Sequence, residues 1–288
     1  MTADEIRTIA VVGAGTMGSQ IAYQVALSGY PVHLYSRSNE RLTSAVGHCG
    51  KLLLKRVEKG KLEQTDCDAA MERVSTTTDL AEACGSADLV IKSVAEDRRL
   101  KRDMFSAISE VAPEHAILAT NSSTMASSFF ADCVRNPARL LNLHFFNPAM
   151  VMQLVEVVRG PHTAEDTVTT AMEFARRIGK TPVLVNKEAY GFVANRIAFI
   201  AMQEAFKLVE EGVVSMEDAD LAVRNGLGWP MGMFELADLV GLDVTENILS
   251  QGHYQTGEER WRPTPILTDH VARGELGRKT GRGFYPSR

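Results

Sequence analysis

The sequence predicts an α/β fold, a doubly wound sheet followed by an all-helical C-terminal domain. Short apolar runs of strand length alternate with helical patterns through the first 187 residues. A glycine-rich turn joins the first of these runs to the first helical pattern. After residue 187 no strand-like run follows, and the apolar spacing is helical. The expected boundary therefore separates a domain of residues 1–187 from a domain of residues 188–288.

The first expected domain begins with a strand, a turn, a helix and a strand. The strand Ile9–Val12 leads into the turn, a helix runs from Met17 to a stop at Gly29, and Pro31–Tyr35 is the next strand. Such a series within about 30 residues is a βαβ unit. The alternation then continues, which indicates a doubly wound sheet. Further strands are expected at 89–91, 116–119, 140–143, 154–158 and 182–185, and helices at 41–58, 100–111 and 164–178.

The second expected domain consists of helices and loops. Residues 192–211 form a long helical stretch, and Ser215 has the side chain of an N-cap before another helix. The glycines of 226–232 predict a loop, and helical spacing resumes through Leu249.

Composition and charge narrow the functional class. The chain has 288 residues, of which 45% are hydrophobic and 23% charged, so it can build about two domains with ordinary cores. Its net charge of −5 gives no basic footprint for nucleic acid. No apolar run approaches 18 residues, so no membrane span is expected.

The cysteines and the first residues bear on the compartment. Cys49, Cys67, Cys84 and Cys133 are widely spaced and form no CxxC pair. They predict reduced thiols rather than a disulfide framework or a zinc site. The acidic start, Met-Thr-Ala-Asp-Glu, has no signal-peptide pattern. We therefore expect a cytoplasmic protein with no metal site.

The turn after the first strand has the GxGxxG spacing of a dinucleotide fingerprint. Gly13 allows the tight turn, Gly15 lets the backbone approach a pyrophosphate, and Gly18 lets helix and strand pack closely. Thr16 and Met17 open the helix, whose free N–H groups and dipole favour phosphate charge. The alternative, a glycine-rich turn without a ligand, is disfavoured by the strand–turn–helix context. A Rossmann-like, dinucleotide-binding domain is expected.

The end of the second strand selects between NAD and NADP. A carboxylate at this position hydrogen-bonds the ribose hydroxyl of NAD, but this chain has Ser36 there, followed by Arg37. A guanidinium can pair with the 2′-phosphate of NADP, so the sequence leans towards NADP. In the alternative, Arg37 stacks on the adenine or faces solvent, and NAD is still used.

A histidine and a glutamate stand in two apolar runs that follow one another along the chain. His144 comes after Leu140–Leu143, and Glu156 lies at the centre of Leu154–Val158. A carboxylate in so apolar a strand is costly unless it is paired, and adjacent strands can bring the two side chains together. Such a pair fixes the imidazole tautomer for proton transfer near neutral pH. The alternative is a buried structural ion pair.

Two further motifs carry polar side chains in positions that suit a ligand. Asn121-Ser122-Ser123 follows the strand 116–119, at an edge where the ligand crevice of a doubly wound sheet lies. An ordinary turn or helix N-cap is the alternative there. Asn195 lies at the domain junction, one turn into a helix, where its amide can donate to a carbonyl oxygen. The alternative is a polar residue at a helix start.

Together these motifs form a recognisable set. In chain order they are Gly-Ala-Gly-Thr-Met-Gly, Asn-Ser-Ser, His-Phe-Phe-Asn-Pro, Leu-Val-Glu-Val-Val, Gly-Phe-Val-Ala-Asn-Arg and Leu-Gly-Arg-Lys-Thr-Gly-Arg-Gly-Phe-Tyr. The set resembles the L-3-hydroxyacyl-CoA dehydrogenase family over essentially the whole chain. It is most similar to the short bacterial 3-hydroxybutyryl-CoA dehydrogenases, since no fused hydratase domain is present.

The resemblance implies a role for each matching residue. His144 corresponds to the catalytic base and Glu156 to its partner carboxylate. Ser123 matches the serine that contacts substrate and nicotinamide, and Asn195 the asparagine that holds the acyl thioester. The positions implied to line the cofactor site are Glu96, Lys101, Asn147 and Lys279. The lysines implied to meet the phosphates of CoA are Lys55 and Lys59, for which a solvated helix face is the alternative.

Four positions depart from the family pattern. Ser36 replaces the acidic ribose ligand, and Lys92 stands where a glutamate is common. Tyr190 and Met233 each replace a familiar proline near the substrate pocket, which leaves the acyl chain length open.

The resemblance implies the reversible oxidation of a 3-hydroxyacyl-CoA to the 3-ketoacyl-CoA, with NAD or NADP. It also implies a homodimer formed through the helical domain. Two other functions stay open. One is a CoA-independent 3-hydroxyacid or sugar-acid dehydrogenase. The other is a non-catalytic nucleotide-binding protein, which the presence of both His144 and Glu156 disfavours.

Overall fold

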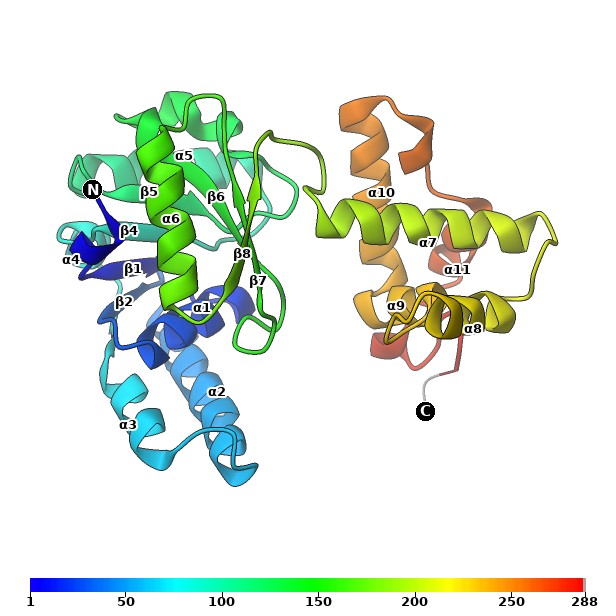
Figure 1. The fold of residues 1–288 in the computed structure, drawn as a ribbon, viewed down its shortest axis with the longest axis horizontal. Helices are drawn as coiled ribbons and strands as arrows, with labels where there is room; N and C mark the ends of the chain where they lie inside the picture. The colour runs from blue at the N-terminus through cyan, green and yellow to red at the C-terminus, as the bar shows by residue number, and fades with distance from the viewer. Residues whose placement is uncertain (287–288) are drawn as a thin grey trace. The chain divides into compact units, whose positions relative to one another are not determined.

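The computed structural model describes residues 1–286, and the chain divides into two compact units between Ala189 and Tyr190. The first unit contains an eight-stranded sheet in the order β3-β2-β1-β4-β5-β6-β7-β8 (Figure 1). The strands are β1 (Ile9–Val12), β2 (Val32–Tyr35), β3 (Val74–Thr77), β4 (Leu89–Lys92), β5 (Ile117–Thr120), β6 (Leu140–Phe145), β7 (Leu154–Val158) and β8 (Thr181–Val185). The first six strands in this order, from β3 through β2, β1, β4 and β5 to β6, pair in parallel. β7 runs antiparallel to β6, and β8 is parallel to β7. The predicted doubly wound sheet is confirmed.

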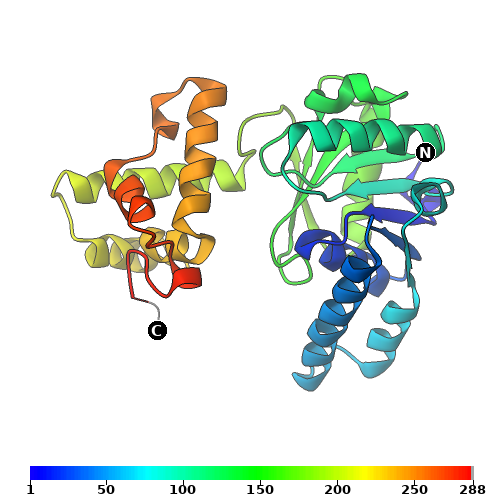
Figure 2. The same ribbon diagram turned by 180° about the vertical axis from the view of Figure 1, so that it is seen from behind.

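Helices cover both faces of this sheet, because its central strands are apolar on both sides. α1 (Thr16–Leu27) and α6 (Glu165–Arg177) cover one face, which Figure 1 shows in front. α2 (Asn39–Glu58) and α3 (Gln64–Glu72) pack beside α1. α4 (Leu80–Cys84), α5 (Arg98–Val111) and the 3-10 helix η2 (Ser127–Cys133) cover the other face, where Figure 2 shows α5 in front of the strands.

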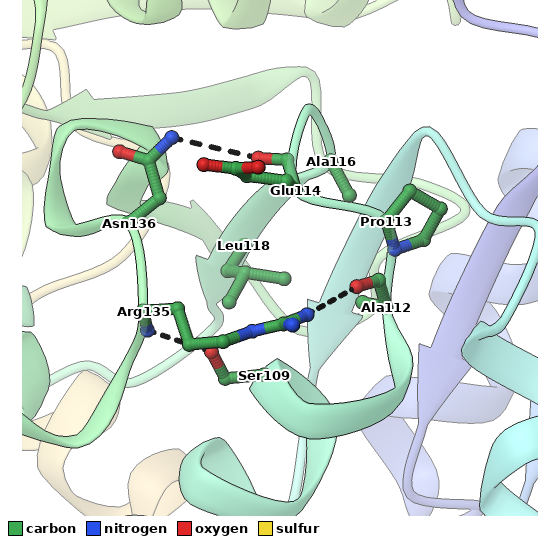
Figure 3. Close-up of a pocket in the computed structure, with 8 residues that line it drawn as sticks. All are labelled: Ser109, Ala112, Pro113, Glu114, Ala116, Leu118, Arg135 and Asn136. Atoms are coloured by element: carbon green, nitrogen blue, oxygen red, sulfur yellow. Dashed lines mark hydrogen bonds between the residues drawn. The ribbon is translucent and has the colours of Figure 1, made fainter.

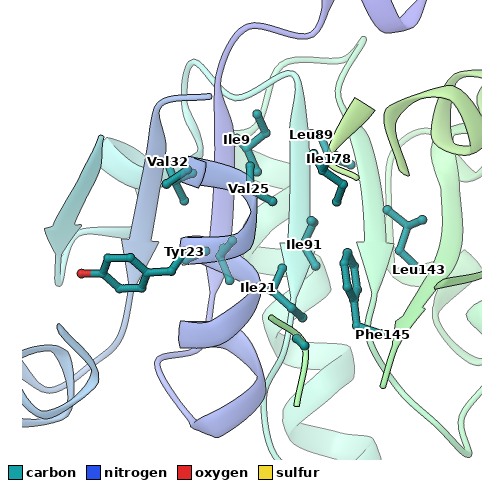
Figure 4. Packing of buried hydrophobic residues seen from close by; sticks show 14 of the residues in the cluster. Ile9, Ile21, Tyr23, Val25, Val32, Leu89, Ile91, Leu143, Phe145 and Ile178 are labelled. Carbon is teal, nitrogen blue, oxygen red and sulfur yellow. The ribbon is translucent and has the colours of Figure 1, made fainter. Parts of the chain in front are cut away.

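Alternate residues of the central strands β1, β4 and β5 enter two separate cores. Ile9 and Ile91 pack against Ile21 and Val25 of α1 on one face (Figure 4). Val90 and its neighbours on the other face pack against α5 and η2. On β6, Leu143 and Phe145 belong to the first core, so His144 between them points to the second face.

One strand and two α-helices of the first unit were not predicted from the sequence. β3 is an edge strand whose sequence, Val-Ser-Thr-Thr, is largely exposed, so it has no apolar run. α3 and α4 are short, with nine and five residues, and give little periodicity to detect.

The second unit is helical, with its own core around Trp261, Phe206 and Phe234. Ser215 caps α8 as predicted, and its Oγ accepts the N–H of Asp218 at 3.1 Å. α7 starts two residues later than expected, because Phe192 has a φ of +48° that no helix accommodates. The helices are α7 (Ala194–Glu210), α8 (Met216–Gly226), α9 (Met233–Val240), α10 (Leu242–Thr256) and α11 (Pro265–Ala272).

Short 3-10 helices complete the chain. Besides η2 they are η1 (Ala3–Glu5), η3 (Pro137–Arg139), η4 (Glu259–Trp261) and η5 (Arg278–Thr280). Among residues 1–286, no helix has both the length and the apolar character that a bilayer crossing requires.

Candidate active site

The carboxyl edge of the parallel strands gathers the predicted site residues of the first unit. The turn at Gly13 leaves β1 at this edge, and Ser123 follows β5. His144 is the fifth residue of β6, one position before that strand ends. Since parallel strands end at the same edge of a sheet, segments far apart in sequence meet there.

The glycine turn has the shape that a dinucleotide pyrophosphate needs. Gly13 has a φ of +117°, and a Cβ on it would overlap the carbonyl oxygen of Ser93. A Cβ on Gly18 would overlap the carbonyl oxygen of Gly13, so α1 approaches β1 as closely as the fingerprint requires. Gly15 is exposed, caps α1, and has open space where a side chain would stand. These residues fit a nicotinamide dinucleotide.

Three side chains form a hydrogen-bonded chain at the same edge. β6 and β7 pair so that His144 lies directly opposite Glu156. The imidazole Nδ1 lies 2.7 Å from Oε2 of Glu156, and Nε2 lies 3.1 Å from Oγ of Ser123. Glu156 is fully buried and the His144 side chain is 3% exposed. The predicted pairing of these two residues is what the antiparallel register produces.

The chemistry of the carboxylate assigns the protons in this chain. An ionised carboxylate only accepts hydrogen bonds, so Nδ1 of His144 carries the proton and donates it to Glu156. Nε2 is then unprotonated and accepts the hydroxyl proton of Ser123. A neutral imidazole with a free lone pair aimed at a hydroxyl group is equipped to act as a general base.

Neighbouring side chains hold the loop that carries Ser123. Asn121 bridges two strand ends, with Nδ2 donating to Ser93 Oγ at 3.3 Å and Oδ1 accepting the N–H of Phe145 at 2.8 Å. Asn142 of β6 is buried, and its Nδ2 donates to the carbonyl oxygens of Ser122 and Met125 at 3.3 and 3.1 Å. The loop is therefore fixed from both sides. Asn142 was not predicted as a site residue, although a polar residue between Leu141 and Leu143 is a signal.

A second network holds the loop from the side of β4. Oγ of Ser122 donates to Glu96 at 2.7 Å, and the backbone N–H of Ser123 donates to the same carboxylate at 3.3 Å. Glu96 also pairs with the ammonium of Lys101, whose side chain is only 2% exposed. Burial lowers the pKa of Lys101, and the adjacent Glu96 opposes that shift. Glu96 thus contacts the Ser123 loop directly, and Lys101 contacts Glu96.

The residues expected to select the cofactor follow β2. Ser36 is buried, and its Oγ accepts the N–H of Ser38 at 3.4 Å. Arg37 is exposed, and no hydrogen bond or ion pair of residues 1–286 involves it. The guanidinium is therefore available to a ligand.

The remaining predicted residues stand on other segments of the two units. Asn147 is exposed, three residues after His144, and Lys55 and Lys59 are exposed on the last turn of α2 and at its C-cap. Two others belong to the second unit. Asn195 is partly buried in the first turn of α7, and Lys279 pairs with Asp243 at 2.6 Å.

The departures from the expected pattern occupy buried positions. Tyr190 donates its hydroxyl to the carbonyl oxygen of Ile248 at 2.7 Å, and Met233 is 1% exposed in the core of the second unit. Lys92 is 1% exposed, with its Nζ 4.5 and 4.9 Å from the ring centres of Phe105 and Phe130. Burial lowers the pKa of Lys92 to about 6, and the nearby Lys101 adds to this effect.

The small pocket in Figure 3 lies away from this location. The cavity in Figure 3 has a volume of about 10 Å³, room for one water molecule, and lies near Ala116 at the opposite end of β5. No group of three or more metal-binding side chains occurs in the described part of the chain.

Comparisons with known proteins agree along the whole chain. Residues 8–189 match the family model described as "3-hydroxyacyl-CoA dehydrogenase, NAD binding domain", and residues 191–287 match "3-hydroxyacyl-CoA dehydrogenase, C-terminal domain". A probable 3-hydroxybutyryl-CoA dehydrogenase of Bacillus subtilis is 40% identical, over 98% of this chain and 97% of that protein. The 3-hydroxybutyryl-CoA dehydrogenase of Clostridioides difficile is 38% identical, over 96% and 98%.

A solved structure shows the same relationship in three dimensions. The crystal structure of (S)-3-hydroxybutyryl-CoA dehydrogenase from Ralstonia eutropha superimposes with a TM-score of 0.94. It is 33% identical, and the match covers 99% of this chain and 100% of that one.

Proposed function

The chain belongs to the 3-hydroxyacyl-CoA dehydrogenase family, and on that premise we propose that it interconverts (3S)-3-hydroxyacyl-CoA and 3-ketoacyl-CoA. The proposed substrate is 3-hydroxybutyryl-CoA, which the names of the similar proteins suggest. The observation that carries the proposal is the buried chain from Glu156 through His144 to Ser123, at the strand edge that also holds the glycine turn.

The proposed proton transfer uses the free nitrogen of His144. Nε2 takes the proton of the substrate 3-hydroxyl, and the carboxylate of Glu156 stabilises the imidazolium that forms. When bound, the nicotinamide supplies the acceptor for the hydride that leaves C3 of the substrate. In the reverse direction, protonated His144 returns the proton to the carbonyl oxygen of the 3-ketoacyl group.

The other residues position the reacting groups. Ser123 Oγ lies within hydrogen-bond distance of Nε2, so a substrate hydroxyl placed beside Ser123 also meets the base. Glu96, Lys101 and Asn142 keep the Ser123 loop in place. We assign Asn195 to the thioester side of the substrate on the family resemblance.

A spectrophotometric assay with acetoacetyl-CoA tests this function. Oxidation of NADH or NADPH by acetoacetyl-CoA, with turnover far above that for free acetoacetate, is the expected result. Activity on free 3-hydroxyacids with none on acyl-CoA would instead support the CoA-independent alternative. No turnover with either substrate would support a nucleotide-binding protein without catalysis.

The proposed cofactor preference is for NADP. Ser36 provides no carboxylate for the ribose hydroxyls, and the exposed guanidinium of Arg37 suits a 2′-phosphate. Steady-state kinetics should give a higher kcat/KM for NADPH than for NADH. Arg37→Ala should lower the value for NADPH about tenfold and leave that for NADH nearly unchanged. A preference of the wild-type protein for NADH would contradict the proposal.

The proposed site for the phosphates of CoA is the basic end of α2. Lys55 and Lys59 are exposed there, and neither takes part in an ion pair of the described residues. The double variant Lys55→Ala/Lys59→Ala should raise KM for acetoacetyl-CoA and leave kcat nearly unchanged, because both contacts are made equally in the ground and transition states.

The proposed oligomeric state is a homodimer formed through the second unit. Several large apolar side chains of this unit are exposed, among them Ile197, Leu227 and Leu239 at 55%, 68% and 48%. Light scattering should give twice the chain mass of 31.5 kDa. A mass of one chain at micromolar concentration would contradict the proposal.

The proposed location is the cytoplasm. All four cysteines are free, and three of them are buried, as in proteins of a reducing compartment. Cell fractionation tests this location.

A further inference from the structure

Lys180 is a buried lysine that the proton-transfer chain does not include. It lies one residue before β8 and is only 6% exposed. Its ammonium donates to the carbonyl oxygens of Ala149 at 2.7 Å and Met152 at 2.9 Å. No ion pair of residues 1–286 involves Lys180, so two carbonyl dipoles take the place of a carboxylate.

A second cation reaches the same stretch of chain. The guanidinium of Arg56, from α2, donates to the carbonyl oxygen of Met150 at 3.4 Å. Burial and the neighbouring Arg56 lower the pKa of Lys180 to about 8. An apolar side chain would fill this buried position at lower cost if packing were its only task. The ammonium is therefore there for the bonds that it donates.

The stretch that these two cations hold joins the strands of the proton-transfer pair. Residues 146–153, here called the β6–β7 segment, run from the end of β6 to the start of β7. The ring of Phe146, the first residue of this segment, lies 4.4 Å from the imidazole of His144, centre to centre. Its last residue, Gln153, accepts the N–H of Thr181 at 2.8 Å.

Packing holds the centre of the segment, since Ala149 and Met150 are buried in the first core, but the two residues that follow pack less. Val151 and Met152 are 63% and 42% exposed, so their side chains provide few packing contacts. Their N–H groups both donate to the carbonyl oxygen of Pro148, at 2.9 Å, which closes a turn within the segment and ties it to nothing outside. The bonds from Lys180 to the carbonyl oxygens of Ala149 and Met152 add a polar link between this turn and the residue before β8.

We propose that Lys180 is a positioning residue for the reaction. It fixes the β6–β7 segment against the start of β8 and thereby keeps Phe146 packed on the imidazole of His144. The inference rests on the proposed function, because the reaction is what gives the orientation of His144 its importance. A base that is displaced by a fraction of an ångström loses much of its rate advantage.

Hydrogen–deuterium exchange and steady-state kinetics on three variants test this role. Lys180→Met removes the donor, Lys180→Arg keeps a cationic donor, and Lys187→Met is the control, an exposed lysine in the same unit. In Lys180→Met we expect faster exchange at Val151 and Met152 and a kcat about tenfold lower. The Kd of the dinucleotide should stay within about twofold, since the glycine turn is untouched. Lys180→Arg should restore most of the slow exchange and most of kcat, and Lys187→Met should match the wild type in both measurements.

Two results would overturn the inference. Unchanged exchange of the segment in Lys180→Met would show that Lys180 does not hold it. Faster exchange with an unchanged kcat would show that the contact is structural only. If Lys180→Met does not fold, Lys180→Gln, a shorter donor, takes its place in the same measurements. Absence of wild-type turnover would refute the proposed function, whereas the exchange data would still decide whether Lys180 holds the segment.

Discussion

Two places where ionisable side chains are buried at the ends of strands differ in the partners that they provide. On β6 and β7, His144 and Glu156 face each other across an antiparallel pair, and Ser123 completes a chain of hydrogen bonds. On β4, Lys92 is equally buried, but its Nζ has no hydrogen-bond partner in the described part of the chain. Its neighbours are the faces of Phe105 and Phe130.

The two places show that a buried charged side chain needs a hydrogen-bond partner to keep its charge. Glu156 can stay ionised because the imidazole N–H donates to it. Lys92 has only the weaker attraction of two rings, so burial lowers its pKa to about 6. Its Nζ lies 4.5 and 4.9 Å from the ring centres of Phe105 and Phe130. We propose the first place for proton transfer, whereas the unpaired lysine of the second carries a cost in stability.

Replacing Glu156, the hydrogen-bond partner of His144, should have the largest effect on kcat. In Glu156→Gln the amide N–H₂ of the new side chain donates to Nδ1, which forces the imidazole proton onto Nε2 and removes the base. We expect kcat to fall about 10³- to 10⁴-fold. Stopped-flow measurement of NADH or NADPH oxidation checks this result, with Glu165→Gln on the surface of α6 as the matched control. A loss below tenfold would show that the pair is structural.

Replacing the unpartnered lysine should stabilise the protein. Met has nearly the length of Lys and needs no hydrogen bond, so Lys92→Met should raise the free energy of unfolding at pH 7 by about 2–4 kcal/mol. Urea denaturation gives this difference, and kcat should remain within about twofold of the wild type. A destabilised Lys92→Met would mean that the amine has partners, such as ordered water, that the apolar surroundings do not suggest.

The gain in the free energy of unfolding expected for Lys92→Met should depend on pH. The pKa of Lys92 is lowered from 10.5 to about 6 in the folded protein. Between these values the unfolded chain binds more protons, so this group makes the free energy of unfolding rise with pH. The advantage of Lys92→Met should therefore shrink by roughly 1 kcal/mol per pH unit between pH 7 and 9.5. A constant difference across this range would contradict the lowered pKa.

The sequence pattern predicted much of the sheet because its buried strands are short apolar runs. Ile9–Val12 and Leu154–Val158 are examples, each bounded by turn residues or polar stretches. The edge strand Val74–Thr77 could not be found in this way, since three of its four side chains are polar. The antiparallel direction of β7 was equally hidden, because alternation of strands and helices says nothing about a strand that follows a loop.

The candidate site was predictable where one residue broke a rule of burial. Glu156 in a run of valines and leucine signalled a partner, and His144 was the nearest candidate. Asn142 broke the same rule and was overlooked. Lys180 gave no such signal, because Gly179-Lys180-Thr181-Pro182 has the composition of an exposed turn. Only the fold shows that its ammonium is buried.

We propose that His144 is the base in the reaction of this 3-hydroxyacyl-CoA dehydrogenase. The most direct test compares kcat for acetoacetyl-CoA reduction with the Kd of the dinucleotide in wild type and His144→Gln. We predict that kcat falls at least 10²-fold while the Kd changes less than about twofold, because the imidazole moves the proton and the glycine turn holds the cofactor. Near-normal turnover in His144→Gln would contradict the assignment of His144 as the base.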